Sequence, residues 1–306
     1  MSSLEDLLKR ELGVTSLQRT GEGGGGCISQ GTAYETENGK IFVKFNNKDK
    51  ADLMFEGEYE SLIALSTANE VRVPKPIKVI RSPKAGAMLV MEYVDIQPLS
   101  HHAAKLGEQM ARLHLHNSTL GAKRATSEQS IHQKYSGYVD KFGFPVQTCC
   151  GFLPQENNYE DDWVTFFAKK IDQHVKLAGD REAEAEWNSL SQNLHKMFKG
   201  LDIKPALLHG DLWGGNAGST DDGPVIFDPA SFYGHAEYDL AISKMFGGFG
   251  KAYFSSYHTL LPQLLGFDDR QELYMMFHYF NHWNHFGGGY RGSTLKILKQ
   301  LAKKYS

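Results

Sequence analysis

The chain contains 306 residues, of which 41% are hydrophobic, and this length and content predict a sizeable core divided between two lobes or domains. Its formal net charge of -3 gives no reason to expect a nucleic acid or an acidic membrane as partner. No apolar run approaches a membrane span, and the charged N-terminus has no signal-peptide core, so we expect a soluble, cytoplasmic protein. The three cysteines form neither a disulfide framework nor a zinc pattern, which fits a reducing compartment.

A glycine-rich segment follows the first predicted helix and a strand expected at residues 14–20. It contains a run of four glycines, Gly23, Gly24, Gly25 and Gly26. Strands are predicted at residues 29–37 and 41–45, joined by a hairpin at Asn38-Gly39. Glycines let the backbone approach phosphates closely, so the run indicates a nucleotide-binding loop. A flexible surface loop is the alternative.

Lys44 and Glu58 are predicted to form an ion pair. Lys44 lies on the face of its strand opposite Ile41 and Val43. A helix is expected at about residues 49–66, and Glu58 falls in its inward apolar stripe, where a carboxylate is costly unless a cation meets it. Such a lysine–glutamate pair positions the phosphates of ATP in kinases. A lysine on an edge strand is otherwise a solvated charge.

Residues 71–80 contain two prolines and predict an extended edge or loop, followed by a buried strand at residues 87–94. We place a linker at residues 95–98, which divides an N-lobe (1–94) from a C-lobe (99–306). Adenine would be read by backbone groups at the end of that strand, namely those of Glu92, Tyr93 and Val94.

A helix is predicted at residues 99–117, with His114 as a satisfied core histidine. Residues 118–145 are polar and predict an irregular surface excursion. Two further helices are expected at about residues 160–177 and 180–198.

The stretch from residue 207 to residue 232 carries the strongest chemical signal. Asp211, Asn216 and Asp228 each follow an apolar run, which predicts buried strands that deliver them to a cleft rim. Asp-x-x-x-x-Asn is the spacing of a phosphoryl-transfer loop, where the Asp accepts the proton of the attacking hydroxyl. Asn216 and Asp228 would hold Mg²⁺ against the phosphates. Asp and Asn before glycine are also ordinary turn residues. The pattern therefore indicates a kinase only together with the glycine-rich loop and the lysine–glutamate pair.

The C-terminal part is predicted to be helical from about residue 234. Asp239 would brace the catalytic loop rather than touch substrate. His278, His282 and His285 share one helical face, where metal binding is possible, but the surrounding aromatic residues favour core packing or a pocket wall. A basic amphipathic helix at residues 295–304 completes the chain.

Taken in this order, the parts resemble the fructosamine-3-kinase (ketosamine-3-kinase) family, within the aminoglycoside phosphotransferase group of protein-kinase-like enzymes. The resemblance covers nearly the whole length and is most specific at residues 24–31, 54–58, 148–155, 207–216, 227–235 and 281–287. It implies an α+β, bilobal protein-kinase-like fold with a small β-rich N-lobe and a larger, mostly helical C-lobe.

The resemblance also implies an activity. The family uses ATP and Mg²⁺ to phosphorylate the 3-hydroxyl of ketoamine sugars on small amines or on lysines of glycated proteins, after which the adduct decomposes and frees the amine. Within the family, the sequence looks closest to the fructosamine-3-kinase-related protein branch, which acts on ribulosamines and psicosamines rather than fructosamines. Two rivals remain open: a kinase for another small alcohol, such as an aminoglycoside or choline, and a catalytically silent nucleotide-binding scaffold.

Several residues depart from the protein-kinase pattern or extend it. Gly210 stands where protein kinases carry an Arg, which predicts no activation-loop phosphorylation switch. Trp213, Trp283 and His285 are candidates for the wall that packs against the sugar or the lysine stem, although they could equally fill the core. Cys27 in the glycine loop is a candidate redox switch, whose oxidation, including oxidation to a disulfide-linked homodimer, would inhibit the enzyme.

Overall fold

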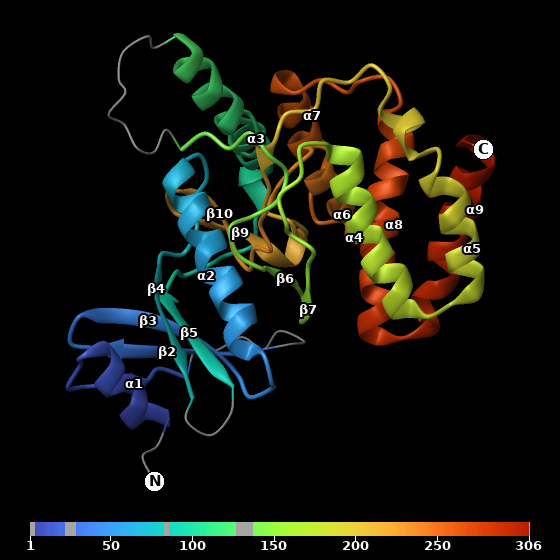
Figure 1. Ribbon diagram of the computed structural model, residues 1–306. Coiled ribbons are helices and arrows are strands. Elements are labelled where there is room, and N and C mark those ends of the chain that lie inside the picture. The colour runs from blue at the N-terminus through green and yellow to red at the C-terminus, as the bar shows by residue number, and fades with distance from the viewer. Residues whose placement is uncertain (1–3, 22–28, 83–85, 127–136, 306) are drawn as a thin grey trace.

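The computed structural model describes residues 4–21, 29–82, 86–126 and 137–305 (Figure 1). The predicted phosphate-binding glycines, Gly23 to Gly26, and Cys27 lie outside these residues. None of the described helices is long and apolar enough to cross a bilayer.

A five-stranded antiparallel sheet with strand order β1-β2-β3-β5-β4 forms the small lobe. Its elements are α1 (Leu4–Leu12), β1 (Gln18–Arg19), β2 (Gln30–Thr36), β3 (Gly39–Asn46), α2 (Ala51–Ala68), β4 (Pro76–Arg81) and β5 (Ala87–Glu92). The predicted hairpin is confirmed, since β2 and β3 pair up to Thr36 and Gly39. The proline-containing β4 is an edge strand, as the sequence suggests, and β5 lies inside the sheet.

The two helices cover opposite faces of the sheet. Leu7 and Leu8 of α1 pack with Val43, whereas Phe55 and Leu62 of α2 belong to the core on the other face. This alternation follows from the two-residue period of the strand, and it turns Lys44 toward α2. Figure 1 shows α1 and α2 on either side of the blue strands.

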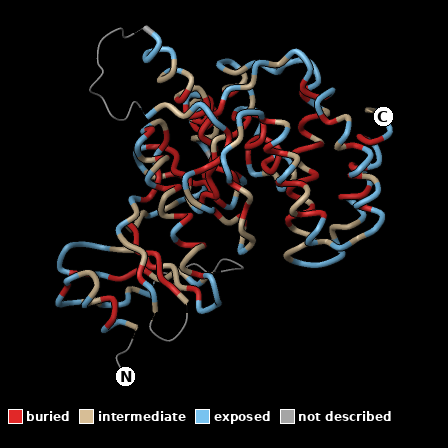
Figure 2. The backbone as a smooth tube through the Cα atoms, in the orientation of Figure 1, coloured by how far each residue is buried: buried red, intermediate tan, exposed pale blue. Residues whose placement is uncertain are grey.

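Helices make up most of the larger lobe. They are α3 (Ala103–Thr126), α4 (Trp163–Ala178), α5 (Arg181–Ser191), α6 (Tyr238–Phe246), α7 (Lys251–Leu260), α8 (Phe267–Phe286) and α9 (Arg291–Tyr305), with short 3-10 turns at Ser100–His102, Leu194–Phe198, Gly214–Asn216 and Gly288–Tyr290. Three two-stranded ribbons join them: β6 (Cys149–Cys150) with β7 (Leu153–Pro154), β8 (Ala206–Leu207) with β11 (Tyr233–Gly234), and β9 (Ala217–Thr220) with β10 (Gly223–Ile226). Figure 2 shows buried backbone concentrated where these helices meet.

Two sequence predictions need correction. The helix predicted to end at residue 117 continues as α3 to Thr126, so residues 118–126 are not an irregular excursion. The strand predicted at residues 14–20 shrinks to β1, because the backbone N–H groups of Thr15 and Ser16 donate to the carboxylate of Glu37 instead of to a neighbouring strand. Polar side chains hid the hydrophobic pattern in both segments. In residues 118–126 they lie on the solvated face of the helix, and near residues 14–20 they replace hydrogen bonds between strands.

The β9–β10 hairpin forms hydrogen bonds with the segment between α2 and β4 and with the segment after β5. Gln97 and Ser219 exchange two backbone hydrogen bonds, each 2.8 Å long, and the N–H of Ile226 donates to Arg72 O at 3.0 Å. The segment after α2 and the segment after β5 are therefore both fastened to one hairpin. The predicted boundary at residues 95–98 includes Gln97, and its role as a hinge stays a prediction.

Candidate active site

The segment that contains Asp211 is anchored by the buried carboxylate of Asp239. Asp239 of α6 accepts hydrogen bonds from the backbone N–H groups of His209 at 2.7 Å and Gly210 at 2.8 Å, and it contacts Nε2 of His114 at 3.1 Å. The other ring nitrogen of His114 lies 2.7 Å from the hydroxyl of Tyr257. The expectations that Asp239 braces the loop and that His114 is a satisfied core histidine are confirmed.

Gly210 and His209 fix the path of the loop. Gly210 has a φ of +85°, and a Cβ there would lie 2.1 Å from Ala230 O, so only glycine fits. Nδ1 of His209 accepts from the N–H of Asp211 at 3.3 Å, which leaves Nε2 to donate to Phe227 O at 3.0 Å. The close approach to Ala230 is the physical reason why an Arg cannot stand at position 210.

The β9–β10 hairpin brings Asn216 and Asp228 together. Asn216 directly precedes β9 and Asp228 follows β10, and the N–H of Phe227 donates to Asn216 O at 3.0 Å. Asp228 adopts a left-handed φ of 57°, a conformation that Asp tolerates better than most residues. The side-chain amide of Asn216 donates to Asp211 O at 2.8 Å and lies 3.3 Å from Asp211 Oδ2. One turn thus holds Asp211 and Asn216 together, and the β9–β10 hairpin returns the chain so that Asp228 lies beside them.

Asp211 lies in an environment that favours its protonated form. Burial, followed by the negative charge of Asp228, raises the pKa of Asp211 to about 7, against the opposing hydrogen bond from Asn216. Its side chain is still partly exposed. A carboxyl group with a pKa near neutrality is well matched to accept a proton from a hydroxyl.

Lys44 joins the two lobes at this site. Its ammonium lies 2.7 and 2.8 Å from the two oxygens of Glu58 and 3.1 Å from Asp228 Oδ1. Burial alone would lower the pKa of Lys44, but Asp228 and Glu58 outweigh burial and raise it, so the lysine is charged. The predicted pairing of Lys44 with Glu58 is present, and their role toward phosphates stays a prediction.

Comparison with known proteins decides the family. A family model described as fructosamine kinase matches residues 1–304. The chain belongs to the fructosamine kinase family. It is 52% identical over 309 residues to the ketosamine-3-kinase of Mus musculus, covering 98% of this chain and 100% of that protein. It is 35% identical to the chloroplastic protein-ribulosamine 3-kinase of Arabidopsis thaliana, covering 93% of this chain and 83% of that protein.

Solved structures confirm the fold of this family member. The putative fructosamine-3-kinase of Haemophilus somnus superposes with a TM-score of 0.77 at 21% identity, over 98% of this chain and 96% of that one. An ADP-bound aminoglycoside phosphotransferase, APH(2'')-Ib, superposes with a TM-score of 0.55 at 13% identity, over 97% of this chain and 95% of that one. The predicted bilobal, protein-kinase-like fold is confirmed. Membership of a kinase family implies the use of ATP.

In this family member the predicted adenine-reading segment ends β5. The side chain of Glu92 pairs with Arg72 at 2.7 Å, and its backbone N–H donates to Lys75 O at 2.8 Å. A hollow of about 330 Å³ that Glu92 lines reaches these residues. The backbone N–H of Glu92 is thus engaged with Lys75, and adenine contacts from the backbone of Glu92, Tyr93 and Val94 remain a prediction.

The three predicted acceptor-wall residues make different ring contacts, and their role toward the acceptor stays a prediction. Trp213 is 36% exposed, and its ring lies 5.6 Å from that of Phe246. Trp283 instead stacks on Phe280 within the helix, with ring centroids 5.8 Å apart. His285 packs against Phe152 at 4.2 Å and accepts the N–H of Phe152 at 3.1 Å.

Residues that sequence reasoning did not assign complete an aromatic strip beside the catalytic loop. Phe246 contacts His282 with ring centroids 4.9 Å apart, and His282 contacts Phe286 at 5.7 Å. His285 also contacts Phe286, at 5.6 Å. The strip therefore runs from Trp213 to Phe152, through residues far apart in the sequence. His282 was visible only as one of three histidines on a helical face.

A buried lysine lies under this part of the lobe. Lys170 of α4 donates to the amide oxygens of Gln155 and Asn157, both at 3.1 Å, and its ammonium lies 4.2 Å from the ring centre of Phe232. Burial lowers the pKa of Lys170 to about 7. No sequence motif distinguishes this lysine from the surface lysines of the same helix.

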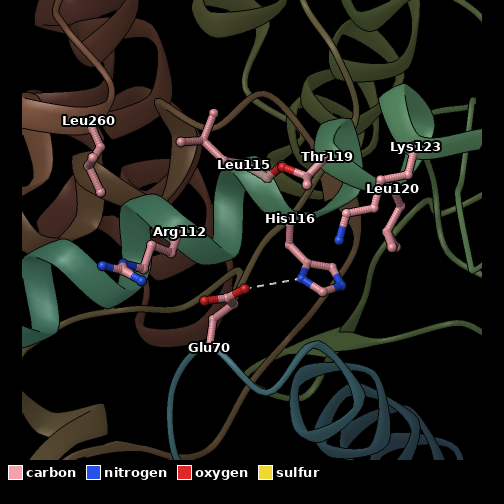
Figure 3. Close-up of a pocket in the computed structure, with 8 residues that line it drawn as sticks. All are labelled: Glu70, Arg112, Leu115, His116, Thr119, Leu120, Lys123 and Leu260. Carbon is pink, nitrogen blue, oxygen red and sulfur yellow. Dashed lines mark hydrogen bonds and ion pairs between the residues drawn. The ribbon is translucent and has the colours of Figure 1, made fainter. Parts of the chain in front are cut away.

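A separate hollow of about 360 Å³ lies along α3 and near the end of α7 (Figure 3). His116 Nδ1 lies 3.2 Å from the carboxylate of Glu70 at its wall, and Figure 3 marks this contact. None of the residues of the predicted kinase site lines it, so we assign it no part in the reaction.

Proposed function

We propose that this chain is an ATP-dependent ketoamine 3-kinase, which phosphorylates the 3-hydroxyl of ribulosamines or psicosamines, and fructosamines less readily, free or on protein lysines. The product would decompose and release the amine, so the reaction would remove glycation. The relatives named ketosamine-3-kinase and protein-ribulosamine 3-kinase support the acceptor class. The observation that carries the proposal is a pair of contacts, Lys44 with Asp228 and Asn216 with Asp211, which the backbone hydrogen bond from Phe227 N–H to Asn216 O holds side by side.

The residues present fit a Mg²⁺ ion. Asp228 offers a carboxylate, and Asn216 uses its amide hydrogens toward Asp211, which leaves its amide oxygen for another partner. Oxygen atoms of this kind are the ligands that Mg²⁺ prefers. A Mg²⁺ ion held by Asn216 and Asp228 would neutralise charge on the ATP phosphates.

Lys44 would contact the phosphates of ATP from the sheet side. Glu58, 8% exposed, orients the ammonium from α2. Once Mg²⁺-ATP occupies the cleft, the lysine can exchange its 3.1 Å contact with Asp228 for a phosphate oxygen without losing Glu58. Positioning of this kind, rather than covalent chemistry, supplies most of the catalysis of phosphoryl transfer.

Asp211 would orient the acceptor hydroxyl and take its proton. Its raised pKa makes the carboxylate a competent base near neutral pH. The exposed ring of Trp213, two residues further along, offers an apolar surface for the sugar ring or the lysine stem. In contrast to Trp283, which packs on Phe280, His282 and Phe246 continue that surface.

The test compares matched ribulosyl-lysine and fructosyl-lysine as acceptors, with ATP consumption measured and the phosphorylated sugar identified by mass. We expect the ribulosyl compound to react faster. Asp211→Asn should lose about 10²–10⁴-fold in turnover while binding a fluorescent ATP analogue with unchanged affinity. Phosphorylation of an aminoglycoside or choline, but of neither ketoamine, would refute the acceptor assignment. Nucleotide binding without turnover on any acceptor would indicate the silent scaffold.

Cys27 lies outside the described residues, and its role as a redox switch stays a proposal. Oxidant treatment should reduce the activity of the wild type and form a disulfide-linked dimer on a non-reducing gel. Equal activity of treated wild type and Cys27→Ser, with the thiol shown to be oxidised, would refute the switch.

A further inference from the structure

A second cluster of potential ligands lies behind Asp211. Cys150 of β6, Asp211 and His278 of α8 each offer one atom, and the three atoms lie within 4.8 Å of one another. Cys150 is 2% exposed and His278 is fully buried, whereas Asp211 is partly exposed to the cleft. The cluster is thus largely shielded from solvent, and the proposed catalytic base is its most exposed member.

Several buried polar atoms around this cluster lack hydrogen-bond partners among the described residues. Neither ring nitrogen of His278 has a hydrogen-bond partner among the described residues, and the same holds for the side-chain oxygens of Asn281 and Tyr238. Asn281 donates its amide to Cys150 Sγ at 3.2 Å, and the ring centroids of Tyr238 and His278 are 5.0 Å apart. A buried polar group without a partner destabilises the folded state, so this grouping indicates a ligand that satisfies several of them at once.

The donor set identifies the chemical class of the ligand. A thiolate, an imidazole nitrogen and a carboxylate oxygen together are typical ligands of Zn²⁺, whereas Mg²⁺ prefers oxygen alone. Bond lengths of about 2.3 Å to sulfur and about 2.0 Å to nitrogen place the two ligand atoms about 3.6 Å apart in a tetrahedron. Small side-chain rotations of Cys150 and His278 would provide this closure. His278 loses no existing hydrogen bond when it binds an ion.

We propose that Cys150, Asp211 and His278 form an inhibitory Zn²⁺ site, in which the bound ion occupies the carboxylate of Asp211 and so removes the base. The thiol proton passes to the solvent as the bond between zinc and sulfur forms. The second ring nitrogen of His278 lacks the outer acceptor that dedicated zinc sites have, so we expect reversible binding rather than a permanent structural ion. The inhibition, but not the binding, rests on the proposed function.

Cysteines of the same chain supply matched controls. Cys149 is the neighbour of Cys150 on β6. Because successive side chains of a strand point to opposite faces, the side chain of Cys149 points away from Asp211 and His278. Cys149→Ser and Cys27→Ser should therefore bind the ion as the wild type does. Cys150→Ser removes the sulfur ligand with little change in volume.

Binding is tested first, with Co²⁺ as a spectroscopic probe of the purified protein. The wild type and the two control variants should show the thiolate-to-cobalt charge-transfer band, which added Zn²⁺ removes, and Cys150→Ser should lack it. His278→Gln, which keeps the thiol, should weaken Co²⁺ affinity by at least about tenfold, as a second test should Cys150→Ser fail to fold. Absence of the band in the wild type, its persistence in Cys150→Ser, or its loss in Cys149→Ser would overturn the site.

Inhibition is tested second, by adding Zn²⁺ to the kinase assay with Mg²⁺ in excess. Wild-type turnover should fall and return on addition of a chelator selective for zinc over magnesium. The Zn²⁺ concentration that halves turnover should rise at least about tenfold in Cys150→Ser. Equal sensitivity of the two proteins would overturn the inhibitory role. Because the cobalt band needs no acceptor, an enzyme inactive on ketoamines would refute the proposed function without deciding the metal site.

Discussion

Asp239→Asn should both destabilise the protein and slow the reaction. Asp239 is fully buried and accepts the N–H groups of His209 and Gly210, at 2.7 and 2.8 Å. Burial by itself raises the pKa of Asp239, but the hydrogen bond and charge of His114 contribute to a pKa below the ordinary value, so the native state holds a carboxylate. Asparagine keeps only one oxygen. One backbone N–H then faces an amide NH₂ group and loses its acceptor.

The magnitude follows from that count. A hydrogen bond to a charged group contributes about 1.5–3 kcal/mol, and an orphaned buried donor costs about 1–3 kcal/mol, so we expect a loss of about 3 kcal/mol in unfolding free energy. Turnover should fall by about tenfold or more, because Asp211 follows directly in the displaced loop and misplacement by about 1 Å costs up to about 10²-fold.

Equilibrium urea unfolding at neutral pH measures the first effect, and initial rates at saturating ATP measure the second. Asp202→Asn is the matched control, because the side chain of Asp202 is 80% exposed and pairs with Lys204 at the surface. That variant should stay within about 0.5 kcal/mol of the wild type. Equal stability and turnover of Asp239→Asn and the wild type would refute the bracing role of this carboxylate.

Further predictions concern the base, the loop glycine, and the buried lysine. The kcat/KM for the ketoamine should fall as pH drops below about 7, because Asp211 must be ionised to accept a proton; a profile flat from pH 5 to 8 would contradict this assignment. Gly210→Ala should cost clearly more unfolding free energy than Gly179→Ala, since both have positive φ but only Gly210 would meet a backbone oxygen; equal urea midpoints would refute the clash. The stability of the wild type relative to Lys170→Met should rise with pH from about 7 to about 10, because the unfolded chain binds the extra proton there; parallel urea curves at all pH values would rule this out.

Patterns of local spacing predicted the parts of the site that lie on regular elements. The strand and helix periods turned Lys44 and Glu58 toward each other, and they ion-pair at 2.7 Å. The Asp-x-x-x-x-Asn spacing gathered Asp211 and Asn216 in one turn. These inferences succeeded because the residues stand close in sequence or face one shared core.

Long-range contacts between residues without a pattern could not be predicted. Cys150 meets Asn281 across 131 positions, and Lys170 meets Gln155 through a fold of the chain that no spacing encodes. His278 was noticed as one of three histidines, but its orphaned nitrogens exist only in the packed lobe. The sequence also could not show that Trp283 stacks on Phe280 of its own helix whereas Trp213 contacts Phe246.

Asn216 and Asp228 lie at the two ends of the β9–β10 hairpin, whose strands form backbone hydrogen bonds with Gln97 and Arg72. We therefore expect any tilt of the sheet against the helices to pivot about the hairpin that presents the proposed metal ligands. Opening of the cleft would leave the spacing of these ligands intact and would move Lys44 relative to them instead. The proposed nucleotide exchange would then break and remake the contact between Lys44 and Asp228, while Asn216 and Asp228 would keep their spacing.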